Sequence, residues 1–162
     1  MKTISSLSEP QEPAHNNLQR RFAQRGITMS DLNAENNKVL VLEAFDTLFN
    51  RRDYKAAERF WSPNYIQHSA HIPPGREGLF NLIKSAPPTL RYEPGVILSD
   101  KEYVIVHGRF SSHGLSPRNW IAADIVRIAD GILTEHWDVL QDEATREESQ
   151  SGLPMFGAKF PA

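Results

Sequence analysis

Two aspartates, Asp124 and Asp138, stand almost symmetrically about the dipeptide Asp130-Gly131. An Asp-Gly pair between two apolar segments is a strong signal for a β-hairpin. The hairpin would bring the two carboxyl groups close together, and two close carboxyl groups titrate at separated pKa values. Such a pair can provide an acid and a base at the same pH, so general acid–base catalysis is the first chemistry that these residues indicate.

The alternation of side chains along a strand decides which way each aspartate points. The face of Asp138 also holds Thr134, His136 and Leu140, and the face of Asp124 also holds Ala122, Val126 and Ile128. A carboxylate on an apolar face needs a partner or a raised pKa. Asp124 is therefore either a functional acid or a buried residue that the backbone or an Arg satisfies. Asp138 is either a pocket base or a surface residue of the hairpin.

Three histidines extend this set. His68 ends the segment Asn-Tyr-Ile-Gln-His, and an imidazole can serve as base or acid near neutral pH. His107 lies inside an apolar strand and is either a second pocket histidine, a bonded core residue or part of the outer sheet face. His136 can orient Asp138. As a further alternative, His68, His71, His107 and Asp138 could bind a metal, but their spacing lacks a tight ligand motif and we predict no metal.

The elements that must position these residues follow from apolar periodicity. Helical spacing predicts one helix from Asn33 to about residues 50–52, a short second helix capped by Asp53, and a third over residues 76–85. A short strand is expected over residues 64–68. Four longer strands are expected over about 90–99, 102–112, 117–129 and 131–141. Helices followed by an antiparallel meander predict an α+β fold whose sheet wraps around helices and leaves a cavity open at one end.

The length and composition of the chain limit its domain organisation, partners and location. The chain has 162 residues, 40% of them hydrophobic, which fits one domain with tails: a polar extension over 1–32, the domain over 33–143 and a tail over 144–162. The absence of cysteine excludes disulfides and thiolate chemistry. A net charge of −2 disfavours nucleic-acid and lipid partners. No apolar run approaches membrane-spanning length and no signal-peptide core is present, so we expect a cytoplasmic protein.

Four short segments follow one another along the chain: Asn64 to His68, Gly75 to Leu79, Asp124 to Gly131, and His136 to Gln141. Taken in this order, they resemble the SnoaL-like branch of the nuclear-transport-factor-2-like superfamily. This branch includes polyketide cyclases and proteins named for presumed aldol chemistry. The resemblance covers roughly residues 33–157.

The resemblance implies a cone-shaped α+β barrel, with three N-terminal helices packed in a strongly curved antiparallel sheet. It also implies a homodimer through the outer sheet face, where Trp137 is expected. It further implies that Asp138 is an acid–base aspartate on the cavity side and that His68 faces the pocket. Asp124 stands where cyclases of this type place a catalytic histidine, which is a departure from their mechanism.

We therefore predict a cofactor-independent lyase, isomerase or cyclase that acts on a small apolar or aromatic carbonyl compound. The alternatives are a non-catalytic binding module of the same fold, and an epoxide hydrolase or dehydratase that uses an Asp/His pair. The predicted catalytic residues are Asp138, His68, Asp124 and His107. The predicted substrate-binding residues are Tyr65, His136, Trp120 and Phe80.

Overall fold

The computed structural model describes residues 28–161. The chain divides into two compact units, residues 1–32 and 33–162, and the sheet and its cavity belong to the second unit. Most of the predicted polar extension, residues 1–27, lies outside the described residues. Within residues 28–161, no helix is both long enough and apolar enough to cross a membrane.

The helices come before the long meander, as the periodicity predicts. Helix α2 spans Met29–Phe45 and continues as a π-helical turn, η1, over Asp46–Asn50. Helix α3 spans Tyr54–Ala57, and the Asp53 side chain caps it by accepting the Ala56 N–H at 3.0 Å. Helix α4 spans Gly75–Ser85. The predicted first helix is thus one continuous run of two geometries, and its last turn carries buried residues that face the sheet.

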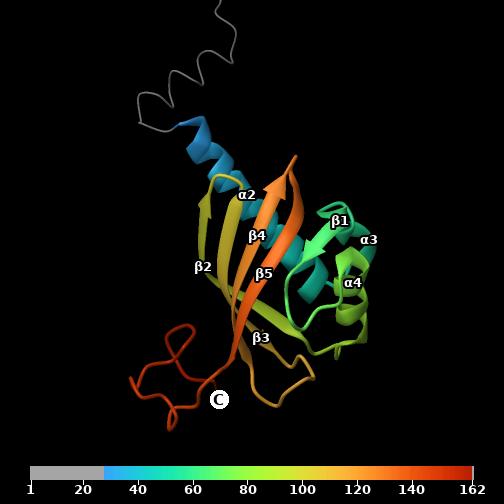
Figure 1. The fold of residues 1–162 in the computed structure, drawn as a ribbon. Helices are drawn as coiled ribbons and strands as arrows, with labels where there is room; N and C mark the ends of the chain where they lie inside the picture. Colours follow the sequence, from blue (N-terminus) through green and yellow to red (C-terminus); the bar gives the residue numbers. More distant parts are fainter. Residues whose placement is uncertain (1–27, 162) are drawn as a thin grey trace, which may run out of the picture. The chain divides into compact units, whose positions relative to one another are not determined.

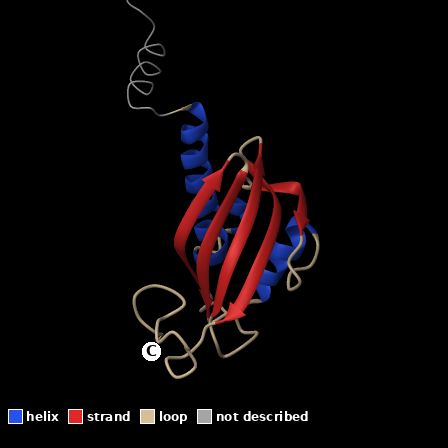
Figure 2. Cartoon of the chain, turned by 60° about the vertical axis from the view of Figure 1, so that its left-hand side comes forward, coloured by secondary structure: helices blue, strands red, loops and turns tan. Residues whose placement is uncertain are grey.

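The strands form one five-stranded sheet in the order β1-β5-β4-β3-β2. Their bounds are β1 Trp61–Gln67, β2 Arg91–Asp100, β3 Tyr103–Ser111, β4 Trp120–Ala129 and β5 Ile132–Asp142. Strands β2 to β5 form the expected antiparallel meander. Strand β1 runs parallel to β5, so the sheet is mixed rather than wholly antiparallel. The helices lie on one face of this sheet and leave the strands of the other face open (Figures 1 and 2).

The predicted hairpin is confirmed at Asp130 and Gly131, which adopt φ values of 51° and 75° between the paired residues Ala129 and Ile132. Positive φ at both central residues is the geometry of a type I′ turn. A β-bulge follows, because Arg127 pairs with Glu135 whereas Ile128 pairs with Leu133. The bulge makes Thr134 the extra residue, so Leu133 and not Thr134 shares the inward face with His136. The prediction for Thr134 was wrong for this reason.

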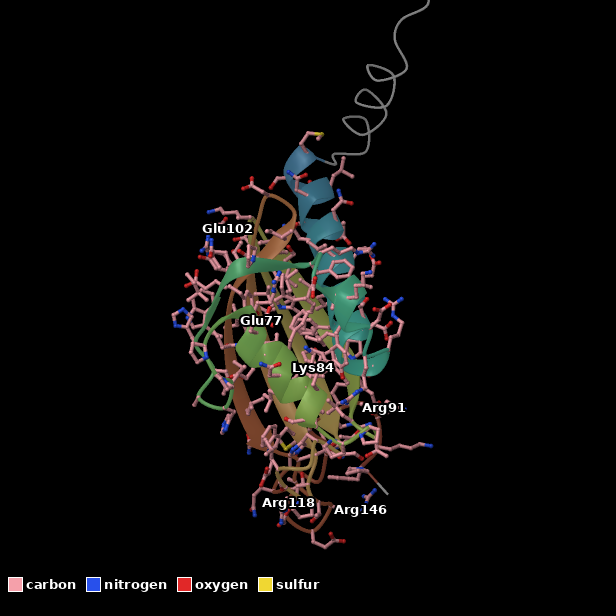
Figure 3. The ribbon with its side chains drawn as sticks, turned by 90° about the vertical axis from the view of Figure 1, so that its right-hand side faces the viewer. Glu77, Lys84, Arg91, Glu102, Arg118 and Arg146 are labelled. Carbon is pink, nitrogen blue, oxygen red and sulfur yellow. The ribbon has the colours of Figure 1, made fainter. Side chains whose placement is uncertain are left out.

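The core lies between the helices and the inner sheet face and is rich in aromatic rings. Phe80 of α4 is 2% exposed, and its ring packs edge-on against Trp61 at 5.6 Å. It is a core residue and does not line the cavity, so its predicted role in substrate binding was wrong. The opposite side of α4 carries exposed charges, of which Glu77 and Lys84 are labelled in Figure 3.

The C-terminal segment, residues 143–161, has no helix or strand and packs near β2 and β3 on the outer sheet face. The Phe156 ring lies 5.7 Å from the His107 ring, and the Arg109 guanidinium lies 4.8 Å from the Phe156 centroid. A Cβ atom at Gly95 would come within 2.9 Å of the Phe156 ring. The segment is therefore fixed to the sheet, and a glycine makes room for it.

Candidate active site

A cavity of about 310 Å³ lies between the helices and the inner face of the sheet. Its wall is mainly apolar and aromatic, and no Lys or Arg of residues 28–161 lines it. The aromatic lining residues are Phe45, Phe49, Trp61, Tyr65, Phe110 and Trp120. The polar groups at its sheet side are Asp124, His136 and Asp138. A wall of this kind selects a neutral, largely apolar ligand and offers it a few polar groups at one end.

The two aspartates predicted from the hairpin do meet. Asp124 of β4 and Asp138 of β5 are directly paired across the two strands, and both line the cavity. Residues at paired positions of an antiparallel ladder have neighbouring side chains, and two like charges there repel each other. The arrangement is tolerable only if at least one of the two carboxyl groups is protonated or is compensated by a partner.

Asp124 has such partners. Its Oδ1 lies 3.2 Å from His136 Nε2, and its Oδ2 accepts a hydrogen bond from the Tyr92 hydroxyl at 3.3 Å. The other ring nitrogen of His136, Nδ1, lies 2.8 Å from Gln67 Oε1. Asp124 and His136 are 3% and 5% exposed. The result is a buried polar chain that runs from β1 through β5 and β4 to β2.

Sequence reasoning missed Tyr92 and Gln67. Tyr92 stands on β2, and to reach Asp124 on β4 it must cross β3. The crossing occurs over Gly108 of β3, where a Cβ atom would come within 2.4 Å of the Tyr92 hydroxyl. A glycine inside an otherwise apolar strand signals such a close approach, so Gly108 was the available clue. For Gln67, no comparable sequence signal exists.

Burial raises the pKa of Asp124 above its ordinary value, and the negative charge of Asp138 adds to this increase. The contact with His136 and the hydrogen bond from Tyr92 act in the opposite direction without reversing it. Burial also raises the pKa of Tyr65, again with contributions from both aspartates. Tyr65 therefore keeps its hydroxyl proton at neutral pH and can donate a hydrogen bond close to the two carboxyl groups.

Asp138 differs from Asp124 in its contacts. It lines the cavity and is half-buried, and within residues 28–161 no side chain pairs with its carboxyl group. It is thus the carboxyl group of the site that a ligand can reach without displacing an existing partner. Its position on the cavity side agrees with the sequence-based expectation.

His68 and His107 lie on the outer face of the sheet and do not line the cavity. His68 Nε2 lies 2.9 Å from Glu135 Oε1, and its ring stacks on Trp137 at 4.7 Å. His107 has the strand parity opposite to the buried Val106 and packs near the C-terminal segment. The expectation that His68 faces the pocket was wrong, because the residue follows the end of β1 and contacts Glu135 on the outer face. For His107, the structure shows the alternative in which it belongs to the outer sheet face, and its predicted catalytic role loses its position in the pocket. Trp137 lies on the outer face, as predicted.

The mouth of the cavity is lined by loops that carry two further histidines. The His113 ring stacks on Trp120 at 3.8 Å, and His71 lies on the same indole at 5.4 Å. Leu115 N–H donates to His113 Nδ1 at 3.3 Å, while His113 Nε2 lies 2.9 Å from the Arg118 carbonyl. His113 therefore braces the β3–β4 loop. Trp120, which we predicted to bind substrate, is part of the aromatic wall of the cavity.

The alternative metal site is not assembled. Two of its four candidate ligands, His68 and His107, lie on the outer face, whereas Asp138 points into the cavity. Across residues 28–161, no group of three or more His, Asp or Glu side chains is arranged to hold a metal ion.

Comparison with known proteins agrees with this architecture. Residues 41–136 match the sequence profile of the SnoaL-like domain. The chain belongs to the SnoaL-like domain family. The matched region includes Tyr65, Asp124 and His136 and ends two residues before Asp138. No curated protein matches the chain.

Several solved structures share the fold. A presumed ketosteroid isomerase from Kribbella flavida superposes with a TM-score of 0.63 at 16% identity, covering 83% of this chain and 100% of that one. AclR, a presumed hydroxylase from Streptomyces galilaeus, superposes with a TM-score of 0.55 at 24% identity, covering 65% of this chain and 88% of that one. A presumed polyketide cyclase from Acidithiobacillus ferrooxidans superposes with a TM-score of 0.57 at 16% identity, again covering 65% of this chain and 88% of the other. At these identities the likeness concerns the fold of this SnoaL-like protein.

Proposed function

We propose that this SnoaL-like protein is a cofactor-independent acid–base enzyme that enolises a small, neutral, apolar carbonyl compound. The observation that carries this proposal is the pairing of Asp124 with Asp138 in the cavity wall, one aspartate bonded and buried and the other unpaired and reachable. Two carboxyl groups in different environments can take different protonation states at one pH. The absence of Lys and Arg from the cavity lining favours a neutral substrate over an anionic one.

In this mechanism Asp138 is the base and Tyr65 stabilises the intermediate. The Asp138 carboxylate takes the proton from the carbon next to the carbonyl group, and the electrons of that C–H bond form the enolate double bond. The negative charge develops on the carbonyl oxygen, where the Tyr65 hydroxyl can donate a hydrogen bond. Asp138 then returns the proton to the same carbon or to another. Isomerisation, aldol ring closure and loss of water can proceed from this enolate. Retro-aldol cleavage releases the same enolate when the base takes the proton of a β-hydroxyl group and the C–C bond breaks, and the enolate is then protonated.

Proton exchange in deuterated water tests the proposed function. Neutral ketones of one to three rings are incubated with the protein, and deuterium uptake next to the carbonyl is followed by NMR. We expect protein-dependent uptake for at least one of them. Line broadening of the ketones without exchange would instead support a non-catalytic binding module. Turnover of epoxides without ketone exchange would support the hydrolase alternative, in which Asp138 activates water.

We also propose that the outer sheet face pairs with a second copy of the chain. Exposed apolar side chains follow adjacent rows of this face: Leu98 pairs with Ile105 across β2 and β3, and Val139 stands on β5. Contiguous exposed apolar surface on a sheet is typical of a protein interface. Sedimentation should show a dimer that Ile105→Glu converts to a monomer. A wild-type monomer at micromolar concentration would contradict the pairing.

A further inference from the structure

The orientation of the Gln67 amide is fixed by a neighbour that can only donate. Ser69 N–H donates a hydrogen bond to Gln67 Oε1 at 2.9 Å. The same oxygen lies 2.8 Å from His136 Nδ1, and Gln67 is the direct strand partner of His136. Since a carbonyl oxygen only accepts hydrogen bonds, the hydrogen of this second contact must sit on His136 Nδ1.

The hydrogen on His136 Nδ1 determines which form of Nε2 faces Asp124. An imidazole with hydrogen on Nδ1 has a bare Nε2 unless it is protonated a second time. Nε2 lies 3.2 Å from Asp124 Oδ1. A bare nitrogen and an ionised carboxylate oxygen would be two acceptors facing each other in a buried site, so a proton must lie between them. The Asp124–His136 pair is then neutral overall, either as carboxylic acid and imidazole or as carboxylate and imidazolium.

The other titratable groups near the pair do not change its net charge. Tyr92 of β2 donates to the second oxygen of Asp124, which either form of the carboxyl group accepts. Tyr65 of β1 keeps its proton, and Asp138 of β5 is the remaining carboxyl group. Among the described residues, the helices contribute no charged residue to the lining, and the two lining histidines other than His136, namely His71 and His113, belong to the mouth loops. A neutral pair therefore leaves Asp138 as the source of negative charge in the cavity.

The same glutamine side chain that accepts these two hydrogen bonds also lowers the stability of the fold through its amide nitrogen. Its Nε2 is buried, and among the described residues it has no hydrogen-bond partner. A buried amide donor without a partner is destabilising, because it gives up its hydrogen bonds with water and gains none in the folded protein. A side chain with an apolar end would avoid this penalty. The feature that accounts for a glutamine at this position is therefore its carbonyl oxygen, which accepts both hydrogen bonds.

We propose that Gln67 is a positioning residue whose carbonyl oxygen selects the Nδ1–H form of His136 and so keeps the Asp124–His136 pair neutral beside Asp138. Gln67 does not line the cavity, and it acts through His136. Only the kinetic consequence for Asp138 rests on the function proposed above. The protonation state of His136 is a property of the protein alone.

The first test is NMR of the imidazole nitrogens in the ¹⁵N-labelled full chain, with His136 assigned through its backbone amide. We expect wild-type His136 to carry hydrogen on Nδ1 at neutral pH. Gln67→Met removes the acceptor, so the ring should change to the form that donates from Nε2 to an ionised Asp124. Gln67→Glu keeps an acceptor and should retain hydrogen on Nδ1. A bare Nδ1 in the wild type overturns the proposal even if Gln67→Met fails to fold, and so does an unchanged ring in a folded Gln67→Met.

The second test is the pH dependence of ketone proton exchange. In Gln67→Met the pair becomes negative, and a negative neighbour makes the ionised base less favourable. The acid limb of the pH–rate profile should therefore move to higher pH by about one unit. Gln141→Met, a change at an exposed position of β5, should leave the limb in place. An unmoved limb in Gln67→Met overturns the inference. Absence of exchange on every ketone, with hydrogen still on Nδ1, would refute the proposed function and leave the His136 assignment standing.

Discussion

The two faces of the sheet carry similar residue types and use them differently. The outer face pairs His68 with Glu135, and Arg127 also contacts Glu135 at 2.7 Å. The inner face pairs His136 with Asp124. Glu135 has its pKa lowered, first by the hydrogen bond from His68 and then by the one from Arg127, whereas burial raises the pKa of Asp124.

The difference between these two His–carboxylate pairs lies in solvation and charge balance. On the outer face, water and Arg127 stabilise the ionised carboxylate, so the contact is an ordinary surface interaction of small energetic value. On the inner face no Lys or Arg of the described residues lines the cavity, so the histidine and the aspartate must share a proton. Chemistry near neutral pH is therefore expected on the inner face, although both faces hold a histidine beside a carboxylate.

The largest expected effect comes from placing one new carboxylate on each face. Val126 is 0% exposed, and Val139 is 69% exposed. Val126→Asp buries an unpaired charge and should cost at least about 4 kcal/mol, enough to unfold a marginally stable domain. Val139→Asp should change the free energy of unfolding by less than about 0.5 kcal/mol, measured in urea under conditions where the chain is monomeric. Equal effects would mean that the two faces are not distinguished by burial.

A smaller effect is expected from the hydroxyl group on the cavity side. Tyr65→Phe keeps the ring in the wall and removes the donor, so ketone exchange should fall about a hundredfold while ligand affinity changes little. Tyr103→Phe makes the same change on the outer face, where Tyr103 lies near Trp137, and should leave exchange unaffected. Both rates come from the same NMR assay. Full activity in Tyr65→Phe would remove this hydroxyl group from the mechanism.

The smallest effect concerns the pH dependence of stability. The folded protein holds the Asp124 proton more tightly than the unfolded chain does, because burial raises the pKa of this group. Its stabilising contribution is therefore complete below the unfolded pKa and is lost as the pH rises through the folded pKa. Asp124→Asn lacks this contribution. The difference in unfolding free energy, wild type minus variant, should thus decrease with rising pH by about 1.4 kcal/mol per unit of pKa shift.

Denaturant unfolding of wild type and Asp124→Asn at several pH values measures this trend. Asp100→Asn, at an exposed site, is the control and should stay within about 0.5 kcal/mol of the wild type throughout. A difference that grows with rising pH would show that Asp124 is stabilised as an isolated carboxylate, as Glu135 is on the outer face.

The elements could be predicted because each depends on neighbours in the sequence. The Asp130-Gly131 turn could be predicted and places β4 beside β5, but its register alone would set Asp124 opposite Trp137. The one-residue shift at the bulge is what sets Asp124 opposite Asp138. The direction of His107 was ambiguous, because Tyr103 and Ile105 make its face as apolar as the Val104–Val106 face along the first half of β3, and Arg109 alone marks it as the outer one. The contact between Tyr92 and Asp124 crosses β3, and although Gly108 marks a close approach there, no local pattern says which residue makes it. The bulge at Thr134 also escaped, since it changes parity without a glycine or proline to mark it.

The most direct test of the central claim compares two carboxyl groups on one strand. Asp138 faces the cavity from β5, and Glu135 faces outward from the same strand. Each is changed to its amide, and deuterium uptake by an exchanging ketone is measured by NMR, with near-UV circular dichroism to confirm the fold. We predict that Asp138→Asn lowers the exchange rate about 10²- to 10⁴-fold and that Glu135→Gln leaves it near the wild-type value. A folded Asp138→Asn that exchanges at the wild-type rate would contradict the assignment of Asp138 as the base.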